Sequence, residues 1–429
     1  MSRIPIDAGL PDTPEWKTRA YFDDDSASQK IQISYARAKS LAKQVGMTVE
    51  DILGPSPKFW GFHLNCELIF PNYTKVATLT NSDMVTADTA VYVILTIHWN
   101  LCIGTIALYP DAHPTVKSIL QELQEFKSVG GFMLSEVGHG HDARNIETTA
   151  TMSSDGSFDL HTPVPHAAKI MPPTTPLAGM SRVAVVFARL IANGVNRGVR
   201  PFIVRTNQVD GTLSPGVVSR LLPSRPGPKP VDHAVTTFHH VYLEPWALLE
   251  DSPNSENPGK DFSRHIQRVT ISTLSLSMGN IPVLRLIAFI AGRYSQRRTV
   301  AGMTTIQRVP IITFSTQHTP ILAALASASV FEAFGRVLCE SFGSENSRVW
   351  SGLACVYKQT VSSAAEALYH DIIDRCGWQG LYAHNQMIEM VMCIRGTSIA
   401  DGDRLVLCIR KFLAEKTFYT STADPNIQA

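Results

Sequence analysis

The sequence has almost no imbalance of charge. Its 429 residues include 38 lysines and arginines against 37 aspartates and glutamates, a formal net charge of +1. Proteins that bind nucleic acid or acidic membranes through charge carry a basic surplus, so we predict neither as a partner. The 44% of hydrophobic and 17% of charged residues are typical of a soluble globular protein. A chain of this length is expected to form two or three structural units.

Paired cysteines and targeting signals are also lacking. The seven cysteines are scattered and none forms a CxxC pair, which indicates reduced thiols in an intracellular protein. The N-terminal residues MSRIPIDAGLPDTPEW contain no apolar run of a signal peptide, and the C-terminal residues NIQA are not an SKL-type peroxisomal signal. We predict a cytoplasmic protein, and a peroxisomal location stays open as the alternative.

One long hydrophobic run is present, from Val91 to Leu108. Its length is nearly enough to cross a bilayer, but His98 and Asn100 lie in its middle. We therefore predict a buried helix rather than a membrane span.

Several enzyme motifs are absent. The sequence has no G-x-S-x-G elbow of the α/β-hydrolases, no P-loop and no Rossmann G-x-G-x-x-G fingerprint. A classical hydrolase or a nucleotide-binding doubly wound sheet is therefore not expected.

The predicted secondary structure changes twice along the chain, from helices to strands and back to helices. Up to about Val129 the pattern is helical: SYARAKSLAKQV and HPTVKSILQELQEF place apolar residues three and four apart. From Gly130 short strands are expected, with SSDGS as a hairpin turn and the proline-rich LPSRPGPKPVD as a loop. We predict an N-terminal helical domain (1–129), a β domain (130–247) and a C-terminal helical bundle (248–429).

The C-terminal region contains two long amphipathic segments. HTPILAALASASVFEAFGRVLCESF and SRVWSGLACVYKQTVSSAAEALYHDIIDRCGWQG both predict helices, and Gly377 is placed to end the second. Pro282 lies within an otherwise helical stretch, so a kink or break is expected near it.

Residues at the start of the β region carry a family resemblance. The stretch GGFMLSEVGHGHDARNIETTATMSSDGSFDL resembles the acyl-CoA oxidases, whose β domain begins with Thr-Glu-Leu-x-His-Gly followed by Glu-Thr-Thr-Ala. The matching residues here are Ser135, Glu136, Val137, Gly138, His139 and Gly140, then Glu147, Thr148, Thr149 and Ala150. Later strands, AVVFA and PFIV, match in the same order.

The resemblance continues through the C-terminal region. RYSQRRTVAG is similar to the family's Arg-Tyr-Ser-x-x-Arg segment, and ITFSTQHTPILAALA to its Thr-Gln helix. Cys376-Gly377-Trp378-Gln379-Gly380 resembles Cys-Gly-Gly-His-Gly, and the count onward without a gap aligns Asp401 with the family's Glu-Gly-Asp glutamate. The resemblance implies an α+β fold of the acyl-CoA dehydrogenase/oxidase type, with an N-terminal α-helical domain, a middle β-barrel domain and a C-terminal helical bundle. The second C-terminal helical domain of long acyl-CoA oxidases is not matched.

The same resemblance implies a reaction and a cofactor. In the family a carboxylate removes the α-proton of an acyl thioester while the β-hydrogen leaves as hydride to FAD, and Asp401 holds the place of that base. An aspartate is also favoured as a helix N-cap, so capping the segment RLVLCIRKFL is the alternative role of the DGD sequence. The resemblance implies cofactor contacts for a further set of residues: Ser135, Gly138, Arg298, Gln317, Gly377 and Gly380. It also implies a homodimer, with FAD between the subunits.

Some residues depart from the family pattern. Lys169-Ile170-Met171-Pro172-Pro173 replaces Lys-Trp-Trp-Pro-Gly, and Pro173 removes an N–H and is expected to add bulk at the edge of the flavin ring. Trp378 and Gln379 replace glycine and histidine. These departures favour a specialised substrate, such as one of secondary metabolism, over an ordinary long-chain acyl-CoA.

Three alternatives follow from these departures. The chain could be a flavin-dependent oxygenase or tailoring enzyme, or a flavin-free acid–base enzyme of the cyclase type on the same fold. A metal site is the third, because Glu136, His139, His141 and Asp142 crowd one short segment. The family has glutamate and histidine at the first two positions without a metal, so we predict none.

Overall fold

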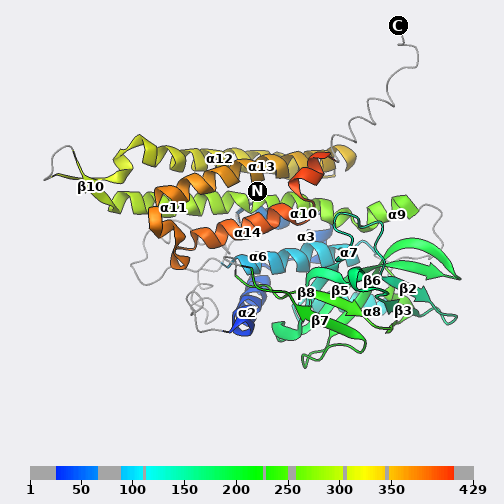
Figure 1. Cartoon of the computed structure of the whole chain (residues 1–429). Coiled ribbons are helices and arrows are strands. Elements are labelled where there is room, and N and C mark those ends of the chain that lie inside the picture. Colours follow the sequence, from blue (N-terminus) through cyan, green and yellow to red (C-terminus); the bar gives the residue numbers. More distant parts are fainter. Residues whose placement is uncertain are drawn as a thin grey trace, which may run out of the picture. The chain divides into compact units, whose positions relative to one another are not determined.

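The computed structural model describes residues 26–65, 88–109, 113–225, 229–249, 258–302, 307–343 and 347–409. The chain divides into two compact units (Figure 1). Unit 1 comprises Met1–Phe62 and Cys66–Ser272, and unit 2 comprises His63–Asn65 and Thr273–Ala429. The boundaries predicted at residues 129 and 247 stay a prediction.

The N-terminal part is helical, as the spacing of its apolar residues predicts. The elements are α2 (Ala27–Val45), α3 (Val49–Leu53), α4 (Pro57–Asn65), α6 (Thr89–Leu95), η2 (Thr96–Ile103), α7 (Gly104–Ile106) and α8 (Pro114–Gln124). Helix α2 begins with a capping box formed by Ser26 and Gln29 and ends at Gly46 in the left-handed conformation. Its buried side chains, such as Ile31, Tyr35 and Leu41, lie on one face.

The hydrophobic run from Val91 to Leu108 is a buried helix, as predicted. It consists of α6, the π-helical η2 and α7, and 89% of the window Thr89–Ile106 is buried. His98 lies inside it because both ring nitrogens have partners: Nδ1 accepts from the N–H of Gly130 at 2.8 Å, and Nε2 lies 3.1 Å from the Leu123 carbonyl. Burial lowers the pKa of His98 to about 3, so the ring is neutral.

The strands of unit 1 form two sheets. The larger sheet has the order β1-β5-β2-β3-β9, with β6 paired to β5, and the smaller has the order β4-β8-β7. The strands are β1 (Ser128–Met133), β2 (Thr149–Met152), β3 (Phe158–His161), β4 (Lys169–Pro173), β5 (Ser181–Ala192), β6 (Val195–Asn207), β7 (Val217–Leu221), β8 (His233–Phe238) and β9 (Val241–Leu243). Strands β2 and β3 are antiparallel neighbours joined through 153–157, which confirms the hairpin predicted at SSDGS.

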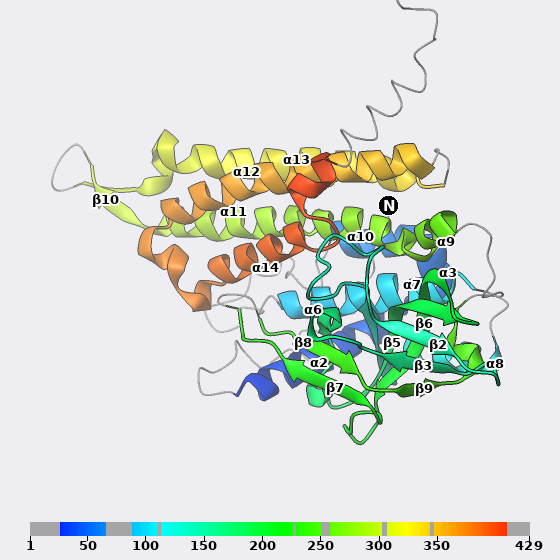
Figure 2. The same cartoon turned by 45° about the vertical axis from the view of Figure 1, so that its right-hand side comes forward.

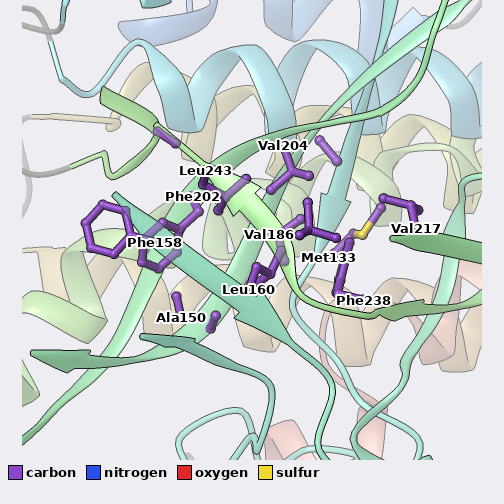
Figure 3. Close-up of a cluster of buried hydrophobic side chains, with 14 of the residues drawn as sticks. Met133, Ala150, Phe158, Leu160, Val186, Phe202, Val204, Val217, Phe238 and Leu243 are labelled. Carbon is purple, nitrogen blue, oxygen red and sulfur yellow. The ribbon is translucent and has the colours of Figure 1, made fainter. Parts of the chain in front are cut away.

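The core of the β region lies on one face of the larger sheet (Figure 3). Alternate residues of β5 enter it, because side chains of a strand point to opposite faces in turn: Ala184, Val186, Ala188 and Leu190. The rings of Phe158 and Phe202 meet edge to face, with centroids 5.2 Å apart.

A buried polar network fixes the N-terminal helices of unit 1 to its sheets. The Asp232 carboxylate accepts hydrogen bonds from Tyr35 at 2.5 Å, from Thr175 at 2.9 Å and from Arg182 at 3.2 Å. The residues belong to α2, the loop after β4, β5 and the loop before β8, so one carboxylate joins four segments that are distant in sequence.

Unit 2 is dominated by long helices, and Figure 2 shows α11, α12 and α13 running side by side. Helix α9 (Pro258–His265) and the first half of α10 (Gln267–Met278) still belong to unit 1. The later elements are α11 (Asn280–Arg297), β10 (Thr299–Ala301), β11 (Arg308–Pro310), α12 (Ser315–Glu340), α13 (Ser347–Arg375) and α14 (Met387–Ile399), with 3-10 turns at Ile311–Thr313, Gly377–Leu381 and Ala383–Asn385. The predicted break near Pro282 is present at Gly279, and Pro282 occupies the first turn of α11, where its missing N–H leaves no bond unmade.

Three helical stretches of the described residues are long and apolar enough, by length and composition, to cross a membrane. The most apolar 18-residue window is 89% buried in Thr89–Ile106 and 83% buried in Asp261–Arg297, but only 33% buried in Ser315–Glu340. Helix α12 therefore differs from the other two in having an apolar face that the described residues leave exposed.

Candidate active site

Ser135 and Gly138 lie in the loop that follows β1 in unit 1. Ser135 is exposed and its carbonyl accepts the N–H of Ile170 at 3.1 Å. Gly138 donates its N–H to the His166 carbonyl at 2.8 Å, and a Cβ on Gly138 would lie 3.1 Å from His166. The two predicted cofactor residues therefore share one exposed loop that is hydrogen-bonded along the edge of β4.

Glu136, between them, anchors this loop. Its side chain is buried and accepts the N–H groups of Glu147 at 2.6 Å and Thr148 at 3.0 Å, as well as the Lys169 ammonium at 2.9 Å. Burial alone would raise the pKa of Glu136, but Lys169 and the two N–H groups outweigh it and the pKa is lowered. Burial lowers the pKa of Lys169 to about 8 even beside this carboxylate.

The histidines of this segment pair with a carboxylate instead of gathering around a metal position. His139 Nε2 lies 2.7 Å and His166 Nε2 2.9 Å from the same Glu147 oxygen. The hydrogen bond to Glu147 raises the pKa of His139. Among the described residues, no three histidine, cysteine, aspartate or glutamate side chains are placed to hold a metal ion, so the metal alternative has no support here.

The structure changes the expected role of Pro173. Pro173 is buried at a register shift between β4 and β8 and adds no bulk to the exposed surface. Met171 of this strand is exposed, with 49% of its surface accessible and a φ of +68°. A positive φ is strained for a methionine, and such strain is concentrated at functional sites. Met171 lies one residue beyond the backbone pairing of Ile170 with Ser135.

Asp401 lies in unit 2, in the turn that follows α14. Its φ is +53°, and its carbonyl accepts the hydroxyl of Thr273 at 2.8 Å. The preceding carbonyl, of Ala400, accepts the ammonium of Lys358. The side chain of Asp401 is half-buried. The structure therefore fixes the backbone of this residue from α10 and from α13.

The capping role belongs to a different aspartate. Asp403 Oδ1 accepts the N–H groups of Leu405 at 2.9 Å and Val406 at 3.4 Å, as an N-cap does. The prediction that the DGD sequence caps a helix is thus correct for Asp403.

Arg298, Gln317 and Gly377 gather where α11 and α13 end and α12 begins. Gln317 is buried and its Nε2 donates to Ser295 Oγ at 2.8 Å and to the Arg375 carbonyl at 2.9 Å. Arg298 is exposed directly after α11. Gly377 has a φ of +55° just beyond α13, which confirms the predicted helix end. The Gln317 amide N–H groups therefore serve the bundle, whereas Arg298 is accessible to a ligand.

Gly380 is required by packing inside the unit. A Cβ at this position would lie 2.7 Å from the Ile373 carbonyl and 3.0 Å from its side chain, so the absence of a side chain is explained without a dinucleotide. Its neighbour Trp378 is 71% exposed, which leaves the indole ring on the surface of this turn.

Asp401 lies beside one part of helix α13, and the group formed by Arg298, Gln317 and Gly377 lies beside another. Asp401 is tied to Lys358, and Gln317 is tied to Arg375, on the same helix α13. These two α13 residues are 17 positions apart, or roughly 25 Å at 1.5 Å per residue. Within unit 2, the candidate base and the candidate phosphate-binding arginine therefore do not form one pocket.

The sequence analysis did not identify Lys358, which donates a hydrogen bond to the turn before Asp401. The signal was present: Lys358 follows Ala354 by four residues and precedes Val361 by three, so it lies on the apolar face of α13. A lysine on such a face is rarely buried without a partner.

The fold is that of the acyl-CoA dehydrogenases and acyl-CoA oxidases. The chain superposes on acyl-CoA oxidase 1 from Yarrowia lipolytica with a TM-score of 0.72, at 19% identity over 95% of this chain and 60% of the oxidase. It superposes on acyl-CoA oxidase-1 of Caenorhabditis elegans, solved with FAD and ATP, with a TM-score of 0.65, at 17% identity over 94% and 68% of the two chains.

A sequence relative points to the same superfamily. The chain is 30% identical to the mouse acyl-coenzyme A oxidase-like protein over 218 residues, which is 48% of this chain and 34% of the mouse protein. Other relatives are named peroxisomal acyl-coenzyme A oxidases. The chain spans only about a third of the length of the curated relatives that it matches first. No protein-family model matches it. The predicted resemblance to the acyl-CoA oxidase/dehydrogenase superfamily and the predicted fold are confirmed.

Glu136 gives the first testable prediction. Replacing it with glutamine is expected to destabilise unit 1 by about 3–5 kcal/mol at mildly acidic pH, because the buried Lys169 ammonium then loses its counter-charge. Without Glu136 the pKa of Lys169 in the folded protein is expected to fall below the value of about 8 that it has in the wild type, so the difference in stability should shrink as the pH rises toward 8 and stay constant above it. Urea unfolding followed by circular dichroism at several pH values measures both effects.

The matched control is Glu125→Gln, which removes an exposed ion pair with Lys127. Exposed pairs contribute little to stability, so this variant is expected to unfold like the wild type. Equal stability of Glu136→Gln and the wild type would show that Glu136 does not anchor the loop.

Proposed function

We propose that this protein is an FAD-dependent oxidoreductase that oxidises the Cα–Cβ bond of an acyl thioester or a related carbonyl compound. The observation that carries the proposal is Asp401, a carboxylate on an acyl-CoA oxidase fold in a turn whose backbone carbonyl groups are held by side chains of two helices. The relatives that share the fold are named acyl-CoA oxidases and dehydrogenases.

The donor groups of this chain fit the needs of FAD. Ser135 offers a hydroxyl at the exposed end of β1, and the exposed Met171 and Val137 flank it with apolar surface suited to a flavin ring. Arg298 offers an exposed guanidinium, whose fork of N–H groups suits a pyrophosphate. When bound, FAD would accept the hydride that leaves the β-carbon.

The role of Asp401 follows from the chemistry of the other carbon. Its carboxylate would take the α-proton, so that the electron pair of the Cα–H bond forms the new double bond as the β-hydrogen leaves. A base must lie within hydrogen-bond distance of the proton that it removes. Aspartate is one methylene shorter than glutamate, so the backbone must bring the carboxylate closer, and a left-handed residue in a fixed turn is a means of doing so.

The substrate class and the cellular location are also proposals. An acyl thioester is the substrate class suggested by the names of the relatives, and a specialised substrate of secondary metabolism is suggested by the departures at Met171 and Trp378. A cytoplasmic location remains a prediction, with the peroxisome as the alternative suggested by relatives that carry that word in their names.

A homodimer is proposed because α12 has an apolar face that no other described part of the chain covers. Its most exposed large side chains are Leu322, Leu325, Val330 and Val337, at 58, 41, 64 and 61%. The exposed residues between them, Ala326, Ser329 and Ala333, are small and uncharged. On this largely apolar face the partly exposed Arg336 is paired with Glu332, so the face can pack against its own copy, as a two-fold interface requires. A second subunit could also bring its Arg298 toward a cofactor that one chain's Asp401 and Arg298 do not reach together.

The cofactor is tested by the visible spectrum of the purified protein. We expect a flavin absorption band, and release of FAD rather than FMN on denaturation, identified by chromatography. A colourless protein that FAD cannot reconstitute would contradict the proposal and favour the flavin-free acid–base alternative. With octanoyl-CoA as the probe, an enoyl product with peroxide supports oxidation, whereas an inserted oxygen atom supports the oxygenase alternative.

The base is tested by Asp401→Asn. Turnover of octanoyl-CoA is expected to fall by roughly a hundredfold to ten-thousandfold, the usual contribution of a general base, while the flavin content is unchanged. Asp403→Asn is the matched control two residues away, where the expected effect is a small loss of helix stability. Wild-type turnover by Asp401→Asn would remove Asp401 from the role.

The dimer is tested by charge on α12. We expect the wild type to sediment as a dimer and the double variant Ala326→Glu, Val330→Glu to sediment as a monomer, because like charges would face each other across the two-fold axis. Val209→Glu, at a residue that is 78% exposed in unit 1, is the control and should stay dimeric. A dimeric double variant would place the interface elsewhere.

A further inference from the structure

The turn that carries Asp401 is fixed at two successive carbonyl groups. Lys358 of α13 donates to the Ala400 carbonyl, and Thr273 of α10 donates to the Asp401 carbonyl at 2.8 Å. The two donors come from helices that are separated by more than 80 residues in sequence, and both side chains are buried. The backbone on either side of the Asp401 Cα is therefore set by tertiary contacts rather than by the turn alone.

The conformation of Asp401 needs such support. A φ of +53° places it in the left-handed region, which is unfavourable for residues other than glycine, although aspartate tolerates it better than most. Without the two donors, the turn would be expected to relax toward conformations that point the carboxylate elsewhere.

Lys358 also supplies charge. Its side chain has no exposed surface, and among the described residues its hydrogen-bond acceptor is the Ala400 carbonyl. Burial lowers the pKa of Lys358 to about 8, against the opposing effect of Asp401. The other groups that face it are Cys355 on its own helix and Asp403 and Arg404 beyond the turn. Near neutral pH the ammonium is thus a buried cation close to the candidate base.

Burial of a cation of this kind lowers the stability of the folded protein, because the ammonium loses its hydration. A methionine would fill nearly the same volume on α13 without the desolvation of an ammonium. Lysine at this position therefore calls for an explanation other than packing, and the proximity to Asp401 offers one.

We propose that Lys358 and Thr273 are positioning residues for Asp401, which hold its carboxylate where a substrate proton can reach it, and that the Lys358 ammonium keeps this carboxylate in its charged form. The catalytic part rests on the proposed function, but the positioning part does not. Thr273 can only position, since it carries no charge, whereas Lys358 does both. This difference makes the two contributions separable.

The first experiment measures hydrogen exchange by mass spectrometry in the purified full chain with its flavin. Peptides that cover residues 396–407 are compared in the wild type, Lys358→Met and Thr273→Val. We expect exchange to be roughly tenfold faster in both variants, since each frees one carbonyl of the turn. The control is Arg395→Met, which breaks a nearby exposed ion pair with Glu366 at 2.8 Å and leaves the turn held. Wild-type exchange in both test variants would overturn the positioning role.

The second experiment measures kcat, KM and the pH profile of octanoyl-CoA turnover. Both variants are expected to lose roughly tenfold to a hundredfold in kcat with little change in KM, because a misplaced base affects the chemical step. In Lys358→Met the acidic limb of kcat/KM should move up by about one pH unit, because the loss of a nearby cation makes it harder for the base to lose its proton. In Thr273→Val this limb should stay in place.

The outcomes separate the two proposals. An unmoved acidic limb in Lys358→Met would overturn the electrostatic role, even if kcat falls. If the wild type turns over no acyl thioester at all, the proposed function fails, and the exchange data still decide whether Lys358 and Thr273 hold the turn. If Lys358→Met does not fold, Thr273→Val alone tests the positioning role.

Discussion

The exposed loop of unit 1 depends on one buried carboxylate. Glu136 accepts two backbone N–H groups and one ammonium, so it joins the segment after β1, the start of β2 and the first residue of β4. Ser135 and Gly138 lie beside it, and their backbones bond to Ile170 of β4 and to His166 in the turn before β4. If this carboxylate were removed, the buried Lys169 ammonium would lose its counter-charge, and the three segments would lose their shared partner. The geometry offered to a cofactor is thus set by a residue that need not touch it.

Much of the architecture could be predicted from the sequence because it depends on local patterns. The helices α2, α8, α12 and α13 follow the spacing of apolar residues, and the β2–β3 hairpin follows its turn residues. The break before Pro282 and the end of α13 at Gly377 follow from backbone chemistry. These features can be predicted without knowledge of distant contacts. The overall fold was predicted from motifs that resemble those of the acyl-CoA oxidases in the same order.

The site was less predictable because its residues act through tertiary contacts. Asp401 and Asp403 are equivalent caps in sequence, and only the structure shows that Asp403 uses its carboxylate for this purpose. Gly380 resembles a glycine kept for a dinucleotide, but it lies against the Ile373 carbonyl. Pro173 is predicted to add bulk at the edge of the flavin ring, but it is buried next to a register shift in β4, whereas Met171 is exposed. In each case the decisive partner lies on another element.

The positions along α13 connect the candidate base with the proposed dimer. Lys358 of α13 contacts the turn that carries Asp401, and the Arg375 carbonyl of the same helix contacts Gln317, near Arg298. The rise of an α-helix separates Lys358 from Arg375 by roughly 25 Å. A rigid helix cannot bring these two positions together. In a single copy of unit 2, the candidate base and the candidate phosphate-binding arginine therefore lie too far apart to share one site. The apolar face of α12, which the described residues leave exposed, gives a physical reason for a second copy to be present. Its Arg298 could then serve the base of the first chain. The incomplete grouping of residues within one unit is therefore an argument for assembly rather than against the proposed chemistry.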